Sequence, residues 1–361
     1  MTMIPPGSTI GIIGGGQLGR MSALAAAELG YKVHIYTPEI DSPASHVASK
    51  VTVASYTDEK ALKAFARSVD VVTFEFENIP VEGIKFLADI VPVRPNPRTL
   101  YIAQHRKREK EFAASAGIQT APFTIVKNAK ELEAAFRSLG VVRGILKTLE
   151  MGYDGKGQRR VNQGDDYADI WADTGFEEAI FEGFIEFEKE ISVIVARGLD
   201  GNVSTFPPAE NTHVNGILDT SKVPSRIAER TSVAARAAAH KLADALDIVG
   251  LLAVEFFVLK EGSVVFNEMA PRPHNSGHWT MDGCVTSQFD QFIRAVCGLP
   301  LGSVRRHSDV VMKNLIGHDY NNWQDILAKD PHAKVHLYGK REVREGRKMG
   351  HVNYVSNLTL D

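Results

Sequence analysis

Two acidic residues interrupt segments that are otherwise apolar. Glu255 stands inside VEFFV and Glu268 inside VVFNEM, and these segments are expected to be consecutive strands of one hairpin that turns at residues 260–262. Antiparallel pairing can bring both carboxylates to one face. A buried carboxylate needs a partner, and Mg²⁺ prefers one or two carboxylates together with phosphate oxygens. Glu255 and Glu268 are therefore candidate metal ligands, with Asn267 as a further oxygen donor; solvated acids on edge strands are the alternative.

A glycine-rich segment, GYDGKGQ, occupies residues 152–158. Its three glycines, the strands expected on either side and the upstream Lys147 are typical of a mobile hairpin whose backbone N–H groups cover phosphates. Lys147 and Lys156 would neutralise phosphate charge. The segment lacks the spacing and the GK[ST] ending of a Walker loop, and a plain glycine hairpin is the alternative.

The segment GGGQLGR places the pattern G-x-G-x-x-G at Gly14, Gly16 and Gly19, between a strand and a helix. This pattern is found in dinucleotide-binding turns, which also need an acidic residue at the tip of the second strand. Here that strand ends with Tyr36 and Thr37, so an acid is missing from its tip. Three interpretations stay open: an NAD site, a turn that faces another ligand, and a role in packing alone.

The segment APRPHNSGHW is too rich in proline and glycine for regular structure. His274 and His278 are four residues apart, which is a zinc-like spacing, but a helix is disfavoured and a third ligand is not evident. Arg272 beside them could instead bind an anion such as bicarbonate. An ordered structural loop is the alternative.

Basic residues gather near the end of the chain, between glycines at 339, 346 and 350. They are Lys340, Arg341, Arg344, Arg347 and Lys348. A phosphate site and a solvated basic face are both consistent with this run.

These residues must be positioned by several structural units. The first hundred residues alternate strand and helix, which predicts a parallel sheet covered on both faces. Helices are expected over Thr99–Ala116 and Ser225–Leu246, and α+β units on both sides of the glycine-rich segment. We predict an N-terminal parallel α/β substrate-binding domain (1–97), two subdomains (98–185 and 186–304) and a small β-rich C-terminal domain (305–361).

Composition narrows the class of protein. The 361 residues carry a net charge of −3, which argues against a dedicated nucleic-acid binder. Cys284 and Cys297 form no CxxC pair and fit a reducing compartment. The sequence lacks a signal peptide and any apolar run of the ~20 residues that a membrane helix needs, so a cytoplasmic protein without membrane contact is expected.

The order of GGGQLGR, EFENIP, GYDGKGQ, NEMAPRPHNSGHW and GRKMGH, from residue 9 to residue 355, resembles the N5-carboxyaminoimidazole ribonucleotide synthetase family of ATP-grasp enzymes. The resemblance implies a pre-ATP-grasp domain, a central ATP-grasp domain of two subdomains and a small C-terminal domain. It also implies a ligase of purine biosynthesis that carboxylates 5-aminoimidazole ribonucleotide with ATP and bicarbonate. The implied cofactors are ATP with Mg²⁺, or Mn²⁺ in its place, and the usual assembly is a homodimer.

The resemblance also implies roles for the residues at matching positions. Nucleotide contacts would be made by Arg106, Lys147, Gly152, Tyr153, Asp154, Gly155, Lys156, Gly157, Gln158, Glu182, Gly183, Phe184, Ile185, Glu190, His213, Asn267 and Glu268, with Glu182–Ile185 at adenine and Glu190 at ribose. Glu255 and Glu268 match the metal ligands. Substrate contacts would be made by Glu75, Tyr153, Arg272, His274, Asn275, Ser276, Lys340, Arg347 and Lys348, and Arg272, His274, Tyr153 and Lys156 would be catalytic.

Alternative functions remain. Within the ATP-grasp enzymes they are a formate-dependent glycinamide ribonucleotide transformylase and a biotin carboxylase, against which HNSGHW and the length of 361 residues favour the first interpretation. An NAD-dependent oxidoreductase would explain only the turn at Gly14–Gly19. A binding module without catalysis would not need both Glu255 and Glu268.

Overall fold

The computed structural model describes residues 2–152 and 157–359. Its N-terminal part is a four-stranded parallel sheet in the order β3-β2-β1-β4, as predicted. The strands are β1 (Thr9–Ile13), β2 (Lys32–Thr37), β3 (Lys50–Val53) and β4 (Val71–Phe74), and the helices are α1 (Gln17–Glu28), α2 (Glu59–Ala66) and α3 (Val81–Ala88). Helix α1 packs on one face of the sheet, and α2 and α3 on the other.

The prediction of one continuous helix over residues 99–116 is wrong. The chain forms α4 (Pro97–Ala103) and α5 (Arg106–Ser115), with a break at Gln104 and His105. The Gln104 amide donates hydrogen bonds to the carbonyls of Glu77 and Ile79 in the loop after β4. The two carbonyls are distant from Gln104 in sequence, and these hydrogen bonds hold the break against the N-terminal domain. Helical periodicity alone could therefore not indicate the break.

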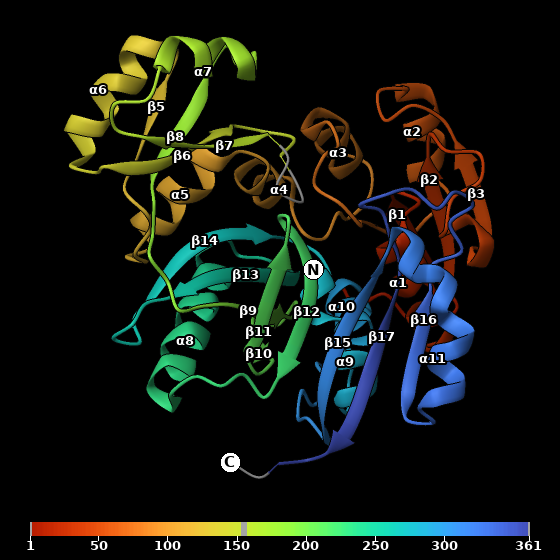
Figure 1. The fold of residues 1–361 in the computed structure, drawn as a ribbon. Helices are drawn as coiled ribbons and strands as arrows, with labels where there is room; N and C mark the ends of the chain where they lie inside the picture. The colour runs from red at the N-terminus through yellow and green to blue at the C-terminus, as the bar shows by residue number, and fades with distance from the viewer. Residues whose placement is uncertain (1, 153–156, 360–361) are drawn as a thin grey trace.

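A small antiparallel sheet follows, in the order β5-β8-β6-β7. It consists of β5 (Phe123–Val126), β6 (Arg143–Thr148), β7 (Gln158–Asn162) and β8 (Ala179–Gly183), with α6 (Ala129–Leu139) and α7 (Tyr167–Thr174) packed against it. Figure 1 shows this sheet above the end of the large sheet that holds β9, β13 and β14.

The large sheet has nine strands in the order β14-β13-β9-β11-β12-β15-β17-β16, with β10 paired to β9. They are β9 (Lys189–Arg197), β10 (Val203–Thr205), β11 (Ala209–Val214), β12 (Ile217–Val223), β13 (Gly250–Val258), β14 (Val264–Ala270), β15 (Ser308–Ile316), β16 (Ala333–Leu337) and β17 (Lys348–Asn357). Helix α8 (Glu229–Ala245) covers one face, and α9 (Thr280–Gly283) and α10 (Gln288–Cys297) lie on the other. Helix α11 (Trp323–Lys329) packs beside β16.

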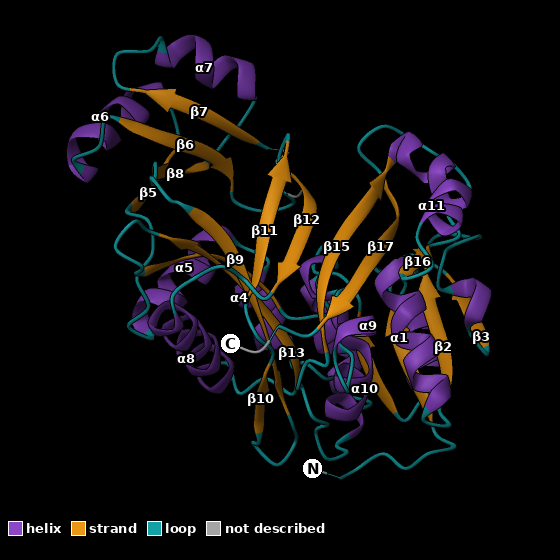
Figure 2. Cartoon of the chain, turned by 60° about the horizontal axis from the view of Figure 1, so that its bottom comes forward, coloured by secondary structure: helices purple, strands orange, loops and turns teal. Residues whose placement is uncertain are grey.

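Two features of this sheet bear on function. Strands of the predicted C-terminal domain extend the same sheet through the pairing of β12 with β15, visible in Figure 2. Helix α10 also packs against α1 and so joins the large sheet to the N-terminal domain. The division of the chain at residues 97, 185 and 304 stays a prediction.

The hairpin of β11 and β12 was not predicted, although a signal for it is present. Asn215 and Gly216 join the two strands and both have positive φ, as a type I′ turn requires. An Asn-Gly pair is the strongest short-range hairpin signal. The strands it joins are polar, which concealed them in a search for apolar runs.

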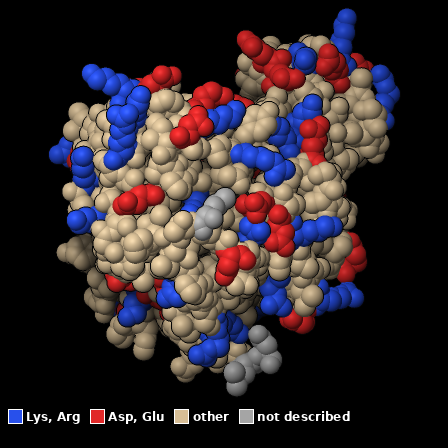
Figure 3. Space-filling model, turned by 180° about the vertical axis from the view of Figure 1, so that it is seen from behind, with Lys and Arg blue, Asp and Glu red and all other residues tan. Residues whose placement is uncertain are grey.

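No helix within residues 2–152 and 157–359 is long and apolar enough to cross a membrane. On the face that Figure 3 shows, acidic and basic side chains are interspersed.

Candidate active site

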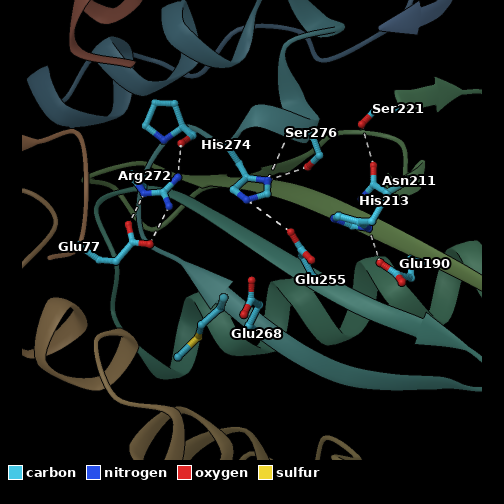
Figure 4. A network of polar contacts seen from close by, with 12 residues as sticks. Glu77, Glu190, Asn211, His213, Ser221, Glu255, Glu268, Arg272, His274 and Ser276 are labelled. Atoms are coloured by element: carbon cyan, nitrogen blue, oxygen red, sulfur yellow. Dashed lines mark hydrogen bonds and ion pairs between the residues drawn. The ribbon is translucent and has the colours of Figure 1, made fainter. Parts of the chain in front are cut away.

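The predicted pair of carboxylates lies where the hairpin was expected to place it. Strands β13 and β14 pair antiparallel with Glu255 directly opposite Glu268, next to an irregularity of register between Glu255 and Phe256. Figure 4 shows both carboxylates pointing toward the space beneath Arg272 and His274. Two facing acids on neighbouring strands repel each other unless a cation lies between or beside them.

Basic side chains compensate one of these two acids. Arg106, at the start of α5, lies 3.1 Å from a carboxylate oxygen of Glu268. Although burial opposes the effect, the charges of Arg106 and Lys147 lower the pKa of Glu268. Burial and the charge of Glu268 raise the pKa of Glu255. The ionised form of Glu255, on the side that faces His274, is therefore the less stabilised of the two carboxylates.

A buried charge network joins the small sheet to the large sheet next to this pair. Lys147 on β6 and Lys110 on α5 both approach one carboxylate oxygen of Glu182 on β8, at 3.0 and 3.2 Å. The Lys110 ammonium also donates to the carbonyl of Asn267 on β14 at 3.1 Å. Although burial opposes it, the charges of Lys110 and Lys147 lower the pKa of Glu182 to about 2. The network thus fixes Lys147 and the strand that carries Glu268 relative to each other.

A second acidic site lies at the start of β9. The side chains of Glu190 and His213 approach each other from β9 and β11, with 2.6 Å between a carboxylate oxygen and Nδ1. They border a hollow of 260 Å³ that also includes Phe187 and Asn211. Although burial opposes it, hydrogen bonding and the charge of Glu190 raise the pKa of His213. The pairing fixes both side chains at the wall of a space large enough for part of a nucleotide.

The segment expected at adenine, Glu182–Ile185, includes the last two residues of β8 and leads to this hollow. One carboxylate oxygen of Glu182 faces the two lysines. The guanidinium groups of Arg143 and Arg160 lie over the ring of Phe184 at 5.0 and 5.9 Å. The backbone N–H of Gly183 donates to the carbonyl of Pro122, and that of Phe184 donates to the carbonyl of Arg143. These hydrogen bonds order the segment.

Arg272 and His274 follow β14 and face the pair of carboxylates. The Arg272 guanidinium binds Glu77 through two nitrogens, one of them 2.7 Å from its oxygen. The Nδ1 atom of His274 shares a hydrogen bond with the hydroxyl of Ser276 at 2.8 Å. Its Nε2 lies 3.4 Å from a carboxylate oxygen of Glu255. Burial and the charge of Arg272 hold the pKa of His274 well below its usual value.

Asn275, in the short 3₁₀ helix η2 (Asn275–Gly277), carries a signature of ligand binding. Neither its amide oxygen nor its amide nitrogen has a partner within the described part of the chain, although both atoms are buried. Buried polar groups are normally hydrogen-bonded. This amide is therefore able to bind a polar group of a ligand.

The glycine turn before α1 holds a protein carboxylate. The backbone N–H groups of Gly16 and Gly19 both donate to Glu75, which follows β4. A Cβ at Gly16 would lie 2.6 Å from a Glu75 oxygen, so this close approach requires glycine. Burial raises the pKa of Glu75, although the N–H groups of Gly19 and Gly16 oppose the shift. Because Glu75 occupies these donors, the NAD interpretation of this turn is wrong.

The basic C-terminal segment closes over the same region. The Lys340 ammonium donates to the carbonyl of Lys348 at 2.7 Å, and the Arg347 guanidinium to that of Glu342 at 3.0 Å. Burial and the positive charge of Arg347 lower the pKa of Lys340 to about 8. Arg341 lies 2.7 Å from Asp41, which fastens the segment to the N-terminal domain. The segment thus lies against the N-terminal domain, where the charges of Lys340 and Glu75 act on each other.

Four predicted residues, Tyr153, Asp154, Gly155 and Lys156, lie outside the described residues. The flanking positions are described. Gly157 has a φ of +69°, and its carbonyl accepts from the N–H of Thr148 at the end of β6. Gly152 and Gln158 complete the ends of this hairpin. Zinc is not supported, since no group of three potential ligands among residues 2–152 and 157–359 could hold a metal.

Comparisons with known proteins agree with this geometry. Residues 7–104 match the family model of a ribonucleotide synthetase pre-ATP-grasp domain, and residues 111–289 match that of an ATP-grasp domain. Residues 310–359 match that of a phosphoribosylaminoimidazole carboxylase C-terminal domain. The N5-carboxyaminoimidazole ribonucleotide synthase of Brucella melitensis is 52% identical, over 99% of this chain and 99% of its own. That of Bacillus subtilis is 44% identical, over 98% and 93%. The chain belongs to the N5-carboxyaminoimidazole ribonucleotide synthase family.

Solved structures support the same assignment. An ADP complex of an N5-carboxyaminoimidazole ribonucleotide synthetase aligns with a TM-score of 0.95 and 46% identity, over 99% of this chain and 94% of that one. The enzyme from Aspergillus clavatus, in complex with ADP and 5-aminoimidazole ribonucleotide, aligns with a TM-score of 0.90 and 28% identity, over 97% and 94%. The expected ATP-grasp fold and ligase class are confirmed.

Two residues of the site were missed by the sequence analysis. Glu77 lies within EFENIP, two residues after Glu75, but only the fold reveals its ion pair with Arg272. Lys110 belongs to a charged helix, where a solvated lysine is the default, yet it is 1% exposed. No local pattern distinguishes it from its exposed neighbour Lys107.

We predict that Lys110→Met lowers the free energy of unfolding by about 3 kcal/mol, because Glu182 loses one of two buried counterions. Lys107→Met, on the same helix but 45% exposed, should change it little. Urea unfolding of the two variants measures the difference. Equal stabilities would remove Lys110 from the network that holds the subdomains together.

Proposed function

We propose that this protein carboxylates the amine of 5-aminoimidazole ribonucleotide with bicarbonate, at the expense of ATP, in purine biosynthesis. The observation that carries the proposal is the position of the facing carboxylates Glu255 and Glu268. They lie between a lysine-lined nucleotide region and a loop with Arg272, His274 and the unpartnered amide of Asn275. A phosphoryl donor and two small substrates can thus meet in one space.

The donor set at β13 and β14 fits Mg²⁺. Two carboxylates face each other, and burial and the charge of Glu268 raise the pKa of Glu255, so a cation beside the pair would stabilise its ionised form. Glu255 and Glu268 would hold the ion, with Asn267 beside them, and Mn²⁺ could take the same ligands. When bound, the ion neutralises charge on the transferring phosphoryl group.

The protein residues supply positioning and charge in the first step. A bicarbonate oxygen attacks the γ-phosphorus of ATP, and the bond to ADP breaks, which gives carboxyphosphate. Lys147 would hold phosphate oxygens, aided by Lys156 of the glycine-rich segment, and Arg106 would orient Glu268. Arg272, fixed by Glu77, would hold the bicarbonate or carboxyphosphate anion, since a planar guanidinium suits two oxygens.

The second step joins carbon to nitrogen. Carboxyphosphate loses phosphate and releases CO₂ beside the amine, whose nitrogen attacks the carbon and loses a proton. His274 and Asn275 would orient the reacting groups, with Tyr153 and Ser276 as further contacts. Because carboxyphosphate is short-lived, water must be excluded from the site.

The nucleotide and the ribonucleotide would enter from different sides. Glu190, His213 and the segment Glu182–Ile185 border the hollow proposed for ribose and adenine. Glu75, Lys340, Arg347 and Lys348 lie between the two ends of the chain and would hold the substrate's ribose and 5′-phosphate. The homodimer remains a proposal that rests on the family resemblance, and the cytoplasmic location one that rests on the sequence features described above.

We predict that ADP release by the purified protein requires bicarbonate and Mg²⁺ and increases when 5-aminoimidazole ribonucleotide is added. Glu268→Gln should abolish most of this activity, because a ligand charge at the transferring phosphate is lost. Glu261→Gln, in the exposed turn of the same hairpin, is the matched control and should retain it. Full activity with formate in place of bicarbonate would favour a transformylase instead.

Arg347→Ala should raise the KM for the ribonucleotide about 10- to 100-fold, since a charge-assisted hydrogen bond contributes ~1.5–3 kcal/mol. A phosphate contact remote from the amine acts mainly through binding, so the KM for ATP should change little. Arg344→Ala, whose side chain is 68% exposed, is the control. Steady-state kinetics with each substrate varied in turn would refute the assignment if the defect were confined to ATP.

A further inference from the structure

Gln288, the first residue of α10, is fully buried beneath the loop that carries His274. Its amide oxygen accepts a hydrogen bond from the backbone N–H of His274 at 3.0 Å, and its amide nitrogen donates to the carbonyl of the same residue at 2.8 Å. One side chain therefore holds both backbone groups of His274. This two-point contact fixes the direction of the His274 backbone, and with it the direction in which the imidazole side chain leaves the backbone.

The chemistry of the contact allows only one arrangement of the amide. Because the N–H of His274 needs an acceptor and its carbonyl needs a donor, the Gln288 oxygen and nitrogen cannot exchange places. The second hydrogen of the Gln288 nitrogen points to Nδ1 of His278 at 2.9 Å. The His278 ring stacks on His351 of β17 at 4.6 Å between centroids. The loop is thus held between α10 and the strand that begins at Lys348.

Gly277 shows how closely the loop and Gln288 fit. A Cβ at Gly277 would lie 2.4 Å from the Gln288 amide oxygen. The φ of Gly277 lies outside the left-handed region, so space rather than backbone strain requires glycine there. The final glycine of HNSG therefore allows the amide of Gln288 to reach His274.

We propose that Gln288 is a positioning residue for the carboxylation. It touches none of the proposed substrates and acts by holding His274 in place, 3.4 Å from Glu255 and next to Arg272. The inference rests on the proposed function, because His274 matters to catalysis only if carboxylation takes place at this loop. Loss of the amide lets the imidazole move, and a displacement of about 1 Å at a reacting centre can cost on the order of 100-fold in rate.

The same helix supplies a matched control. Gln291, also fully buried, holds Gly302 through the same two-point contact, with distances of 2.9 and 2.7 Å to its backbone carbonyl and N–H. Gly302 lies in the segment between α10 and β15, outside the proposed site. Substitution of either glutamine by methionine therefore removes a buried two-point contact with a backbone. Gln288→Met also removes the contact with Nδ1 of His278, and only this variant disturbs His274.

The test compares Gln288→Met and Gln291→Met by thermal unfolding and by steady-state kinetics of ADP release dependent on 5-aminoimidazole ribonucleotide. Both variants should lower Tm, and Gln288→Met should lower it more, because Gln288 makes an additional hydrogen bond to His278. Gln288→Met should lower kcat about 10- to 100-fold with a KM for ATP within about twofold of the unmodified protein. Gln291→Met should keep kcat within about twofold.

A kcat for Gln288→Met within about threefold of the unmodified protein, or an equal loss of kcat in Gln291→Met, would overturn the proposal. If Gln288→Met does not fold, Gly277→Ala decides, because its methyl group displaces the Gln288 amide without altering α10. Gly277→Ala should also lower kcat at a nearly unchanged KM for ATP, and an unaltered kcat would overturn the proposal. Failure of the proposed function is recognised separately, because the unmodified protein would then lack ribonucleotide-dependent ADP release.

Discussion

The facing carboxylates Glu255 and Glu268 impose the constraint on which the rest of the site depends. Their negative charges lie opposite each other on paired strands, and burial makes the uncompensated charge costly. Arg106 and the network of Lys110, Lys147 and Glu182 compensate one side. The other side faces Arg272 and His274, where a metal ion and anionic substrates complete the balance in the proposed function. Nucleotide and substrate sites therefore share one electrostatic centre.

Distant parts of the chain are needed to build this centre. The N-terminal sheet contributes Glu75, held by the glycine turn, and Glu77, which binds Arg272. The C-terminal strands extend the large sheet and bring Lys340 and Arg347 over the opposite side. Helix α10 packs against α1 and also holds the loop of His274 through Gln288. The same elements that hold the domains together thus fix the direction of the reacting side chains.

The sequence was informative where function depends on local pattern. The register of Glu255 and Glu268 follows from two strands and a short turn, and the glycine turn was found from its spacing. Where partners lie far apart in sequence, prediction failed. Gln104 interrupts a helix by contact with the loop after β4, and Lys110 is buried by elements from both subdomains. The Asn215-Gly216 turn, by contrast, is a local signal of a hairpin that did not enter the prediction.

The central claim is that ATP activates bicarbonate beside these carboxylates, and an isotope measurement tests it most directly. The bicarbonate oxygen that attacks the γ-phosphorus stays on phosphorus when the carbon–oxygen bond of carboxyphosphate breaks. We therefore predict that ¹⁸O-labelled bicarbonate, supplied with ATP and 5-aminoimidazole ribonucleotide, delivers one labelled oxygen to each phosphate released. Mass spectrometry of the phosphate provides the result. Phosphate without label, formed at the full rate of carboxylation, would contradict the account.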